Sequence, residues 1–189
     1  MKFKPAKRSD IPSIVMMLAD DELGRKREEF NNPIPKKYYD AFDAILNDKN
    51  QELIIFENDE KEIIGTLQLT FIPYLTYQGG IRAQIEAVRI HNNFRGKGFG
   101  KQLFEWAINR SHQKGAHLVQ LTTDKKRPVA IEFYKALGFC SMPLLRSQIN
   151  HFDLLYGAII ARNSLYILLK YPKYNRALTG AKIDVLEAA

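Results

Sequence analysis

Cysteine is nearly absent from the sequence, and this excludes a fold stapled by disulfide bonds. Cys140 is the single cysteine among 189 residues, so no disulfide can form within the chain. A lone thiol suits a reducing compartment, because disulfide frameworks belong to oxidising ones. We therefore expect stability to come from a packed core, for which an apolar share of 46% is ordinary.

Long apolar runs and targeting signals are also missing. No early segment joins a basic start, an apolar middle and a small-residue cleavage site, so secretion is not expected. The most apolar late run, Leu154 to Leu169, contains Arg162 and Asn163 and is too short to cross a bilayer comfortably. The sequence thus predicts a cytoplasmic protein with no membrane partner.

Positive charge is present but is not concentrated in one long run. The formal net charge is +7. Such a surface suits a polyanionic small molecule, whereas a nucleic acid partner is not expected, because recognition-helix and base-stacking motifs are absent. No metal is expected either, since His112, His117 and His151 lack the spacing of metal ligands.

Hydrophobic periodicity predicts an α/β (α+β) domain over residues 1–139. The second expected helix, after Pro35, presents Tyr38, Phe42, Ile45 and Leu46 as one stripe. The expected order is βααβββαβα, with strands at 2–4, 53–56, 63–71, 81–90 and 118–121 and helices beginning near 10, after 35, near 98 and at 128. In residues 140–189 we expect a helix at 154–160 and strands at 164–170 and 181–186.

A change of phase within residues 81–90 predicts a β-bulge. Odd-numbered residues from Ile81 to Ala87 are apolar, and then Val88 and Ile90 become the apolar set. A strand keeps its apolar side chains on one face across such a slip when it gains an extra residue. A strand buried on both faces is the alternative explanation. A bulge would leave backbone groups unpaired and available to a ligand.

Three glycines at alternate positions follow that strand, in Arg95-Gly-Lys-Gly-Phe-Gly100. Glycine permits positive φ and a close approach of the backbone to a ligand. If a helix begins there, its free N–H groups form a phosphate or pyrophosphate site, to which Arg95 and Lys97 add positive charge. The spacing is neither that of a P-loop nor that of a dinucleotide fingerprint. A glycine-rich connection without a ligand is the alternative.

Three segments in this order resemble the motifs of the GNAT superfamily of N-acetyltransferases. The stretch from Arg95 to Gly100 resembles its acyl-CoA signature Arg/Gln-x-x-Gly-x-Gly/Ala. Ile85 to Ile90 resembles its bulged fourth strand, and Ala130 to Phe139 resembles its Ala-x-x-Phe-Tyr-x-x-x-Gly-Phe helix. The resemblance covers residues 1–139. It implies the GNAT fold, a mixed and mostly antiparallel sheet flanked by helices, with acetyl-CoA as co-substrate.

The resemblance also implies which residues hold acetyl-CoA. The segment Val88, Arg89 and Ile90 would bind the pantetheine arm and acetyl carbonyl, mainly through the backbone of its first and last residues. The pyrophosphate would be held by the amides of Arg95, Gly96, Lys97, Gly98, Phe99 and Gly100. The family often has Asn seven residues before its conserved helix tyrosine, where this chain has Arg127. An arginine there would reach a CoA phosphate instead.

Glu86 and Tyr134 are the candidate catalytic residues. Tyr134 matches the position that in many members protonates the departing CoA thiolate, although core packing alone would also explain it. Glu86 matches a strand position where some relatives carry a glutamate near the amine. A carboxylate there can take the proton of the amine directly or through one water. An ordinary polar strand residue is the alternative for Glu86.

The acceptor is not identified by the sequence. Asp20 to Glu22 would receive a cationic amine and Arg25 to Arg27 an anionic one, and both sets are also explained as solvated helix surface. Tyr74, Leu75 and Tyr77 could wall an acceptor pocket. We therefore expect a small-molecule or peptide amine without a more specific identity.

Residues 140–189 depart from the GNAT pattern, in which one more strand follows the Gly-Phe motif. Cys140-Ser-Met-Pro143 does not look like that strand. Ser164 to Lys170 could supply it after a detour, or a second subunit of a homodimer could. The remaining alternative is that the segment is an altered reading-frame product or a fusion.

The function that the sequence predicts is direct acetyl transfer from acetyl-CoA to a primary amine, with no covalent enzyme intermediate. The alternative is a catalytically inactive CoA-binding or regulatory module on the same fold.

Overall fold

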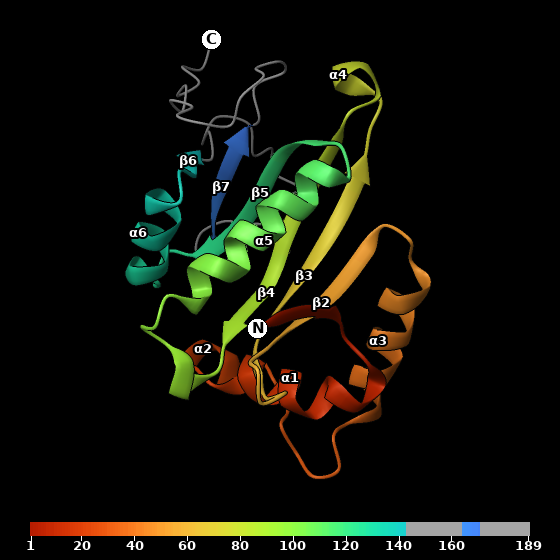
Figure 1. The fold of residues 1–189 in the computed structure, drawn as a ribbon, viewed down its shortest axis with the longest axis vertical. Helices are drawn as coiled ribbons and strands as arrows, with labels where there is room; N and C mark the ends of the chain where they lie inside the picture. Colours follow the sequence, from red (N-terminus) through yellow and green to blue (C-terminus); the bar gives the residue numbers. More distant parts are fainter. Residues whose placement is uncertain (143–163, 171–189) are drawn as a thin grey trace, which may run out of the picture.

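The fold is seen in a computed structural model that describes residues 1–142 and 164–170 (Figure 1). Most of these residues belong to one twisted sheet or to the helices that cover it. The strands are β1 Lys2–Pro5, β2 Gln51–Glu57, β3 Ile63–Pro73, β4 Ile81–Ile90, β5 Ala116–Asp124, β6 Cys140–Met142 and β7 Ser164–Lys170.

The longer helices begin where the sequence places proline or glycine. Pro12 lies in the first turn of one helix, Gly98 caps a second, and Pro128 opens a third. The helices are α1 Ile11–Ala19, α2 Glu22–Arg25, α3 Lys36–Asn47, α4 Thr76–Gly79, α5 Phe99–Gln113 and α6 Pro128–Ala136, with 3₁₀ turns at Arg8–Asp10 and Asn92–Phe94.

The described strands form a seven-stranded sheet in the order β1-β2-β3-β4-β5-β7-β6. The pair β4 and β5 is parallel and the other neighbouring pairs are antiparallel. The mixed, mostly antiparallel sheet and the predicted order βααβββαβα are confirmed. The short helices α2 and α4 are additions that the sequence pattern did not predict, because a single turn is too short to show a period of 3.6 residues.

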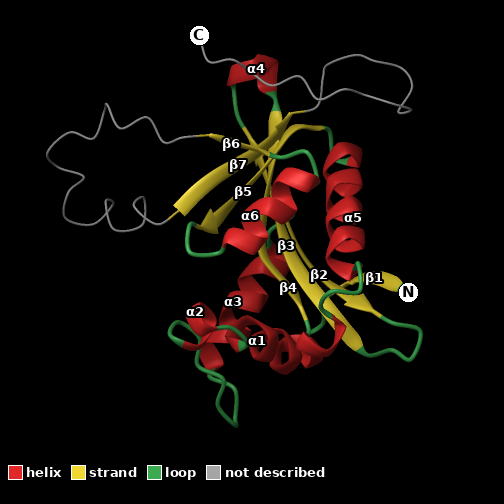
Figure 2. Ribbon diagram, turned by 90° about the vertical axis from the view of Figure 1, so that its left-hand side faces the viewer, coloured by secondary structure: helices red, strands yellow, loops and turns green. Residues whose placement is uncertain are grey.

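Helices cover both faces of the sheet (Figure 2). On one face Leu103, Phe104 and Ala107 of α5 are buried against residues of β2 to β5. On the other face Ile14 of α1 and Phe42 of α3 pack together with residues of β2. The predicted stripe of α3 is wrong at its end, because the side chain of Leu46 is 67% exposed.

The strand after the Gly-Phe motif corrects one prediction. Cys140–Met142 does form a strand, β6, which pairs with β7 through Cys140 and Leu168. Three residues cannot show alternation, so the pairing comes from the tertiary context rather than from the pattern. The predicted strand Ser164–Lys170 is confirmed as β7, and it pairs with β5 within the same chain.

Two further sequence predictions fall on residues that lie outside the described part of the chain. These are the helix at 154–160 and the strand at 181–186. The domain boundary after residue 139 and the contribution of a second subunit stay predictions.

Candidate active site

The strand β4 contains the predicted β-bulge. Its register with β3 pairs Gln68 with Glu86 but Thr66 with Arg89, so that two residues of β4 lie opposite one residue of β3. Ala87 takes up the extra length with a φ of 52°, a left-handed conformation that is unusual for a residue with a side chain. The bulge is confirmed, and it leaves backbone groups of Ala87 and Val88 outside the regular ladder.

The strands β4 and β5 separate just where the bulge begins. Their parallel pairing ends with Ile85 and Leu121, whereas β5 goes on to pair with β7 through Asp124. A cavity of about 380 Å³ opens in this gap. It is lined by Leu18, Arg27, Glu28, Ile85, Glu86, Ala87, Val88, Arg89, Phe104, Leu121, Thr122, Thr123, Asp124, Arg127 and Tyr134. We call this cavity the slot.

The glycine loop lies at the end of β4 and leads into α5. Gly96 and Gly98 have φ of 75° and 81°, and Gly98 is the N-cap of α5. No atom lies within 4 Å of the place where a Cβ would stand on either of them, so the loop presents bare backbone. The N–H of Lys101 donates to the carbonyl of Gly98 at 3.1 Å, and within the described residues no partner is seen for the N–H groups of Phe99 and Gly100, which could bind an anion.

The two basic side chains of this loop have partners within the protein. Arg95 Nε donates to the carbonyl of Ile90 at 3.0 Å, and its Nη2 lies 2.8 Å from the carboxylate of Asp20. The ammonium of Lys97 lies 5.3 Å from the ring centre of Phe94. An anion bound at the loop would compete with Asp20 for Arg95, since the side chain of Arg95 is about half exposed.

Tyr134 projects from α6 into the slot. Its ring lies 5.3 Å from that of Phe104, and it also packs against Phe133 and Phe139. Burial raises the pKa of the Tyr134 hydroxyl above its ordinary value, although Arg127 and Arg89 favour the phenolate. The hydroxyl is thus protonated at neutral pH and can donate a proton. Tyr134 therefore packs against the core and also lines the slot.

Glu86 lies on the wall of the slot one residue before the bulge. Its side chain is exposed, and among the described residues it has neither a hydrogen bond nor an ion pair. A carboxylate without a partner is free to accept a proton from a group in the slot.

A charged cluster on the slot was not predicted from the sequence. Arg127 Nη2 lies 2.6 Å from the carboxylate of Asp21, which also accepts the backbone N–H of Gly24 at the start of α2. Arg89 lies 3.8 Å from the same carboxylate. Partial burial raises the pKa of Asp21, but this hydrogen bond and the nearby arginines outweigh it and hold the pKa below its ordinary value.

The charges of the loop after α1 are therefore more than solvated surface. Asp20 and Asp21 pair with Arg95 and Arg127, which belong to segments far away in the sequence. No local pattern in the sequence indicates these pairs, because their partners are 75 and 106 residues apart.

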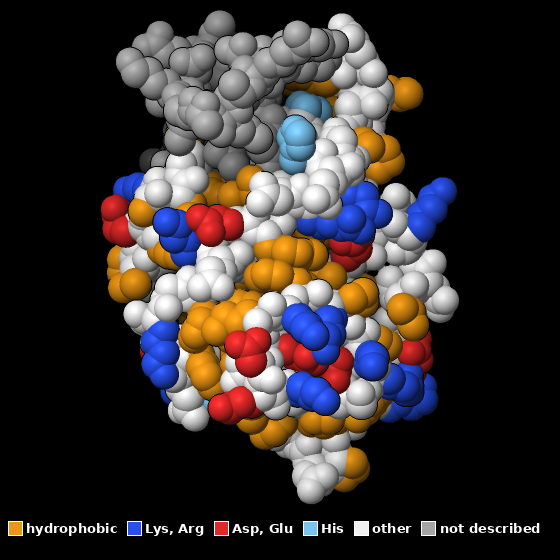
Figure 3. Space-filling model, viewed as in Figure 1, with side chains coloured by type: hydrophobic (Ala, Val, Ile, Leu, Met, Phe, Trp, Pro, Cys, Tyr) orange, Lys and Arg blue, Asp and Glu red, His pale blue; other side chains and the backbone are white. Residues whose placement is uncertain are grey.

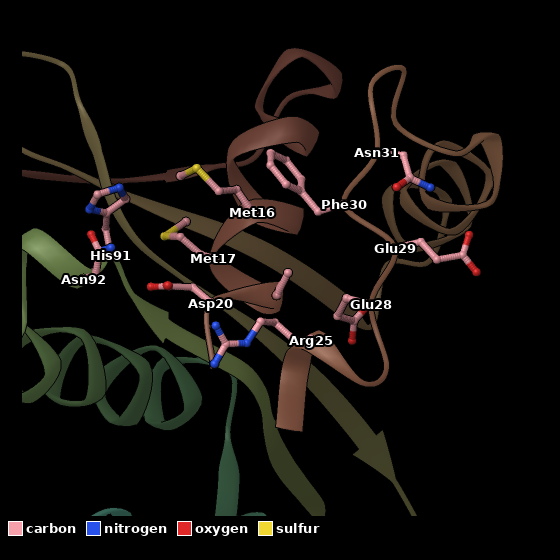
Figure 4. Close-up of a pocket in the computed structure, with 11 residues that line it drawn as sticks. Met16, Met17, Asp20, Arg25, Glu28, Glu29, Phe30, Asn31, His91 and Asn92 are labelled. Carbon is pink, nitrogen blue, oxygen red and sulfur yellow. The ribbon is translucent and has the colours of Figure 1, made fainter. Parts of the chain in front are cut away.

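A second cavity, of about 510 Å³, adjoins the slot and is shown in Figure 4. Glu28 lines both cavities, so they share a wall. The cavity is lined by residues of α1, of the loop after it, of α2, of the segment after α2 and of the turn after β4: Met16, Met17, Ala19, Asp20, Arg25, Glu28, Glu29, Phe30, Asn31, His91 and Asn92.

The aromatic residues expected to wall an acceptor pocket are not brought to the slot. Tyr74 and Tyr77 pack around His117, beyond the first residue of β4 and at its opposite end from the bulge. The hydroxyl of Tyr74 lies 2.6 Å from His117 Nε2.

The surface carries mixed charge. On the face seen in Figure 3, Lys and Arg side chains are interspersed with Asp and Glu and do not form a continuous basic stripe. Within residues 1–142 and 164–170, no group of three or more potential ligand side chains could hold a metal ion. In the same residues no helix is both long and apolar enough to cross a bilayer.

A comparison with protein-family models decides the family. The model of the acetyltransferase (GNAT) family matches residues 20–139, which include β4, the glycine loop and α6. The chain belongs to the GNAT family. This family generally uses acetyl-CoA as its acetyl donor, and the resemblance found in the sequence is confirmed.

Relatives of this GNAT chain carry different functional descriptions. A solved structure described as a transcriptional regulator from Bacillus halodurans C-125 is 52% identical, with a TM-score of 0.72 over 78% of this chain and 99% of that one. The aminoalkylphosphonate N-acetyltransferase of Salmonella typhimurium is 31% identical over 103 residues, which are 54% of this chain and 65% of that protein.

The fold recurs at lower identity. A spermidine N-acetyltransferase SpeG chimera from Vibrio cholerae and hSSAT has a TM-score of 0.67 at 20% identity, covering 90% of this chain and 96% of that one. The chain spans 25% and 65% of the lengths of two curated relatives that it matches.

Proposed function

We propose that the protein is an N-acetyltransferase that moves the acetyl group of acetyl-CoA to a primary amine in the slot. The observation that carries this proposal is the place of the bulge. It takes backbone groups of Ala87 and Val88 out of the regular ladder at the point where β4 and β5 separate, immediately before a glycine loop and a helix start.

The residues present fit the donor. In this proposal the backbone of Val88, Arg89 and Ile90 holds the pantetheine arm, as an additional strand would pair with β4. The amides from Arg95 to Gly100 hold the pyrophosphate, and the bare backbone at Gly96 and Gly98 supports this role. Arg127 remains a proposed contact to a CoA phosphate, in competition with its observed partner Asp21.

The chemistry needs few side chains. An amine attacks the thioester when it is neutral, so Glu86 takes the proton of the ammonium directly or through one water. The carbon–nitrogen bond then forms and the carbon–sulfur bond breaks, while an N–H group at the bulge stabilises the carbonyl oxygen. Tyr134 gives its proton to the sulfur, and the nitrogen, now bonded to the acetyl group, releases its second proton through water to restore the Tyr134 hydroxyl. Most of the acceleration comes from holding the two reactants together, an effect of up to about 7–11 kcal/mol.

The proposal also covers the acceptor, the cellular location and the oligomeric state of the protein. We propose a small-molecule or peptide amine as acceptor, and the name of the Salmonella relative supports an amine substrate. A cytoplasmic location, no resident metal, and neither nucleic acid nor membrane as partner remain our expectations. A homodimer remains an alternative to the monomer.

Two measurements test the function. Acetyl-CoA should raise the melting temperature of the protein, because a ligand that binds the folded state stabilises it. An amine panel should then release CoA thiol in an acetyl-CoA-dependent way, above the hydrolysis seen without amine. An unchanged melting temperature at saturating acetyl-CoA would contradict the proposal.

A regulatory module that binds CoA without turnover is the second candidate. The observation in its favour is the description of the 52% identical B. halodurans protein as a transcriptional regulator. A rise in melting temperature with acetyl-CoA, together with no thiol release from any amine, would favour this candidate over the enzyme.

A further inference from the structure

The side chain of Arg89 is a poorly satisfied charge inside the slot. It is 17% exposed, and its Nη1 donates to the carbonyl of Val88 at 2.8 Å. Its Nε is buried and has no hydrogen-bond partner. A guanidinium has five N–H donors, so most of those on Arg89 are available to another acceptor.

The nearest carboxylate does not satisfy Arg89. Asp21 Oδ2 lies 3.8 Å from Arg89 but 2.6 Å from Arg127. The same carboxylate accepts the N–H of Gly24, and Arg27 is a further positive charge near it. Two arginines therefore face one carboxylate that is hydrogen-bonded to only one of them. A buried charge without a hydrogen-bonded partner is costly, so this pair favours a second anion.

The bulge places Arg89 on the same face of the sheet as Glu86. Their cross-strand partners are Thr66 and Gln68, which are two residues apart on β3 and so point to the same face. In a regular strand, residues 86 and 89 would point to opposite faces. The bulge thus sets an unpaired carboxylate and an under-paired guanidinium side by side, about 7 Å apart along the strand.

The acidic residues of the adjoining cavity are already paired. Asp20 lies 2.8 Å from Arg95, Glu28 accepts the hydroxyl of Tyr38 at 3.0 Å, and Glu29 lies 2.8 Å from Lys37. A second positive charge on the acceptor would have to displace these partners. A negative charge near Arg89 would compete only with Asp21, which is not hydrogen-bonded to Arg89.

We propose that the acceptor is a short primary amine that also carries an oxyanion, either a carboxylate or a phosphonate or phosphate group, and that Arg89 binds this oxyanion. The proposal rests on the acetyl transfer proposed above. The amine of such a molecule lies toward Glu86 and the bulge. Its oxyanion lies between Arg89 and Arg127, and Arg127 then serves the acceptor in place of a CoA phosphate. Asp21 is the internal carboxylate that neutralises the two arginines until the acceptor enters.

Four amines of similar length test this specificity by thiol release at saturating acetyl-CoA. They are 3-aminopropanoate, 2-aminoethylphosphonate, propylamine and 1,3-diaminopropane. At least one of the two oxyanion amines should have a kcat/KM at least about tenfold above that of propylamine, because a hydrogen-bonded charge pair supports binding to this extent. The ratio between the two shows which oxyanion the site takes.

Arg89→Met tests the residue, with Arg82→Met as its matched control. Arg82 belongs to the same strand and also has a buried Nε without a partner, but it lies over the ring of Tyr74 at 5.4 Å. Arg89→Met should lower the ratio of oxyanion amine to propylamine by about 10- to 100-fold. Arg82→Met should leave that ratio within about twofold of wild type.

Asp21→Asn is the second variant, in case Arg89→Met does not fold. Asparagine keeps a side-chain oxygen for the N–H of Gly24 but loses the charge that competes for the arginines. The KM for the oxyanion amine should therefore fall about threefold or more. The KM for propylamine should not fall with it.

Three results overturn the inference. One is equal or better turnover of propylamine or the diamine in wild type, and another is an unchanged preference in a folded Arg89→Met variant. The third is an unchanged or higher KM for the oxyanion amine in Asp21→Asn. These results leave the acetyltransferase proposal standing, whereas absence of thiol release from every amine would overturn both.

Discussion

The two walls of the slot are built in different ways. The proposed donor wall is backbone: the bulge at Ala87 and Val88, which lines the slot, and the loop at Gly96 and Gly98 that follows β4. The proposed acceptor wall is made of side chains: Arg89 and Arg127, which face Asp21, and Glu86. A backbone wall binds what all members of a family share, and a side-chain wall can change with the substrate.

The first and largest effect is expected on the donor wall. Gly98→Ala keeps the charge of the loop but adds a Cβ at a φ of 81°. Alanine disfavours that conformation by about 1–2 kcal/mol relative to glycine, so the loop should shift. We expect binding of acetyl-CoA to weaken about 100-fold, since a shift near 1 Å can cost that much. Isothermal titration of acetyl-CoA measures the effect.

Gly115→Ala is the control for this variant. Gly115 has a φ of 76° and open space around it, but it lies after the far end of α5. Both variants should lose similar stability, and Gly115→Ala should keep the acetyl-CoA affinity of wild type. If the two variants lose affinity equally, the loop has no special role.

The next effect is expected from Tyr134, which lines the slot. Tyr134→Phe should lower kcat about 10- to 100-fold, since loss of a general acid costs this much for a thiolate that leaves fairly easily. Affinity for acetyl-CoA should change little. Tyr39→Phe, which removes a hydroxyl from the core beneath α1 and α3, should leave kcat unchanged.

The pH profile separates an acid from a packing residue. Tyr134 acts while it is protonated, and burial raises its pKa above the ordinary 10.0. Activity that depends on it is therefore fully present below pH about 10 and is lost as pH rises through the raised pKa. Wild type should show this alkaline decline, and Tyr134→Phe should lack it. Identical profiles would assign Tyr134 to packing alone.

The contrast between the walls also explains what the sequence could predict. The bulge, the glycine loop and the helix start come from one continuous stretch, Ile85 to Gly100, so local pattern was enough. Asp21 and Arg127 are 106 residues apart and meet only in the folded chain. Their pairing has no local signal. The strand at Cys140 was missed for a similar reason, because β7 rather than its own three residues makes it a strand.

A smaller effect is expected from Glu86 on the acceptor wall. Glu86→Gln should lower kcat/KM about tenfold at neutral pH. This loss is smaller than the usual contribution of a general base, because water can also take the proton. The deficit should shrink as pH rises and the free amine loses its proton unaided. Glu105→Gln on the outer surface of α5 is the control. A deficit that does not change with pH would argue for a structural role of Glu86.

The smallest effect is expected at the bulge itself, where a substitution by glycine should stabilise the protein. Ala87 holds a φ of 52°, so Ala87→Gly should relieve about 1 kcal/mol of strain and raise the free energy of unfolding. Ala83→Gly, four residues earlier in β4 and buried in the regular ladder, should instead lower it by about 1 kcal/mol. Urea unfolding of both variants measures the difference. If both glycines destabilise the protein, Ala87 stores no strain, and the open backbone of the donor wall is held by packing from α5 instead.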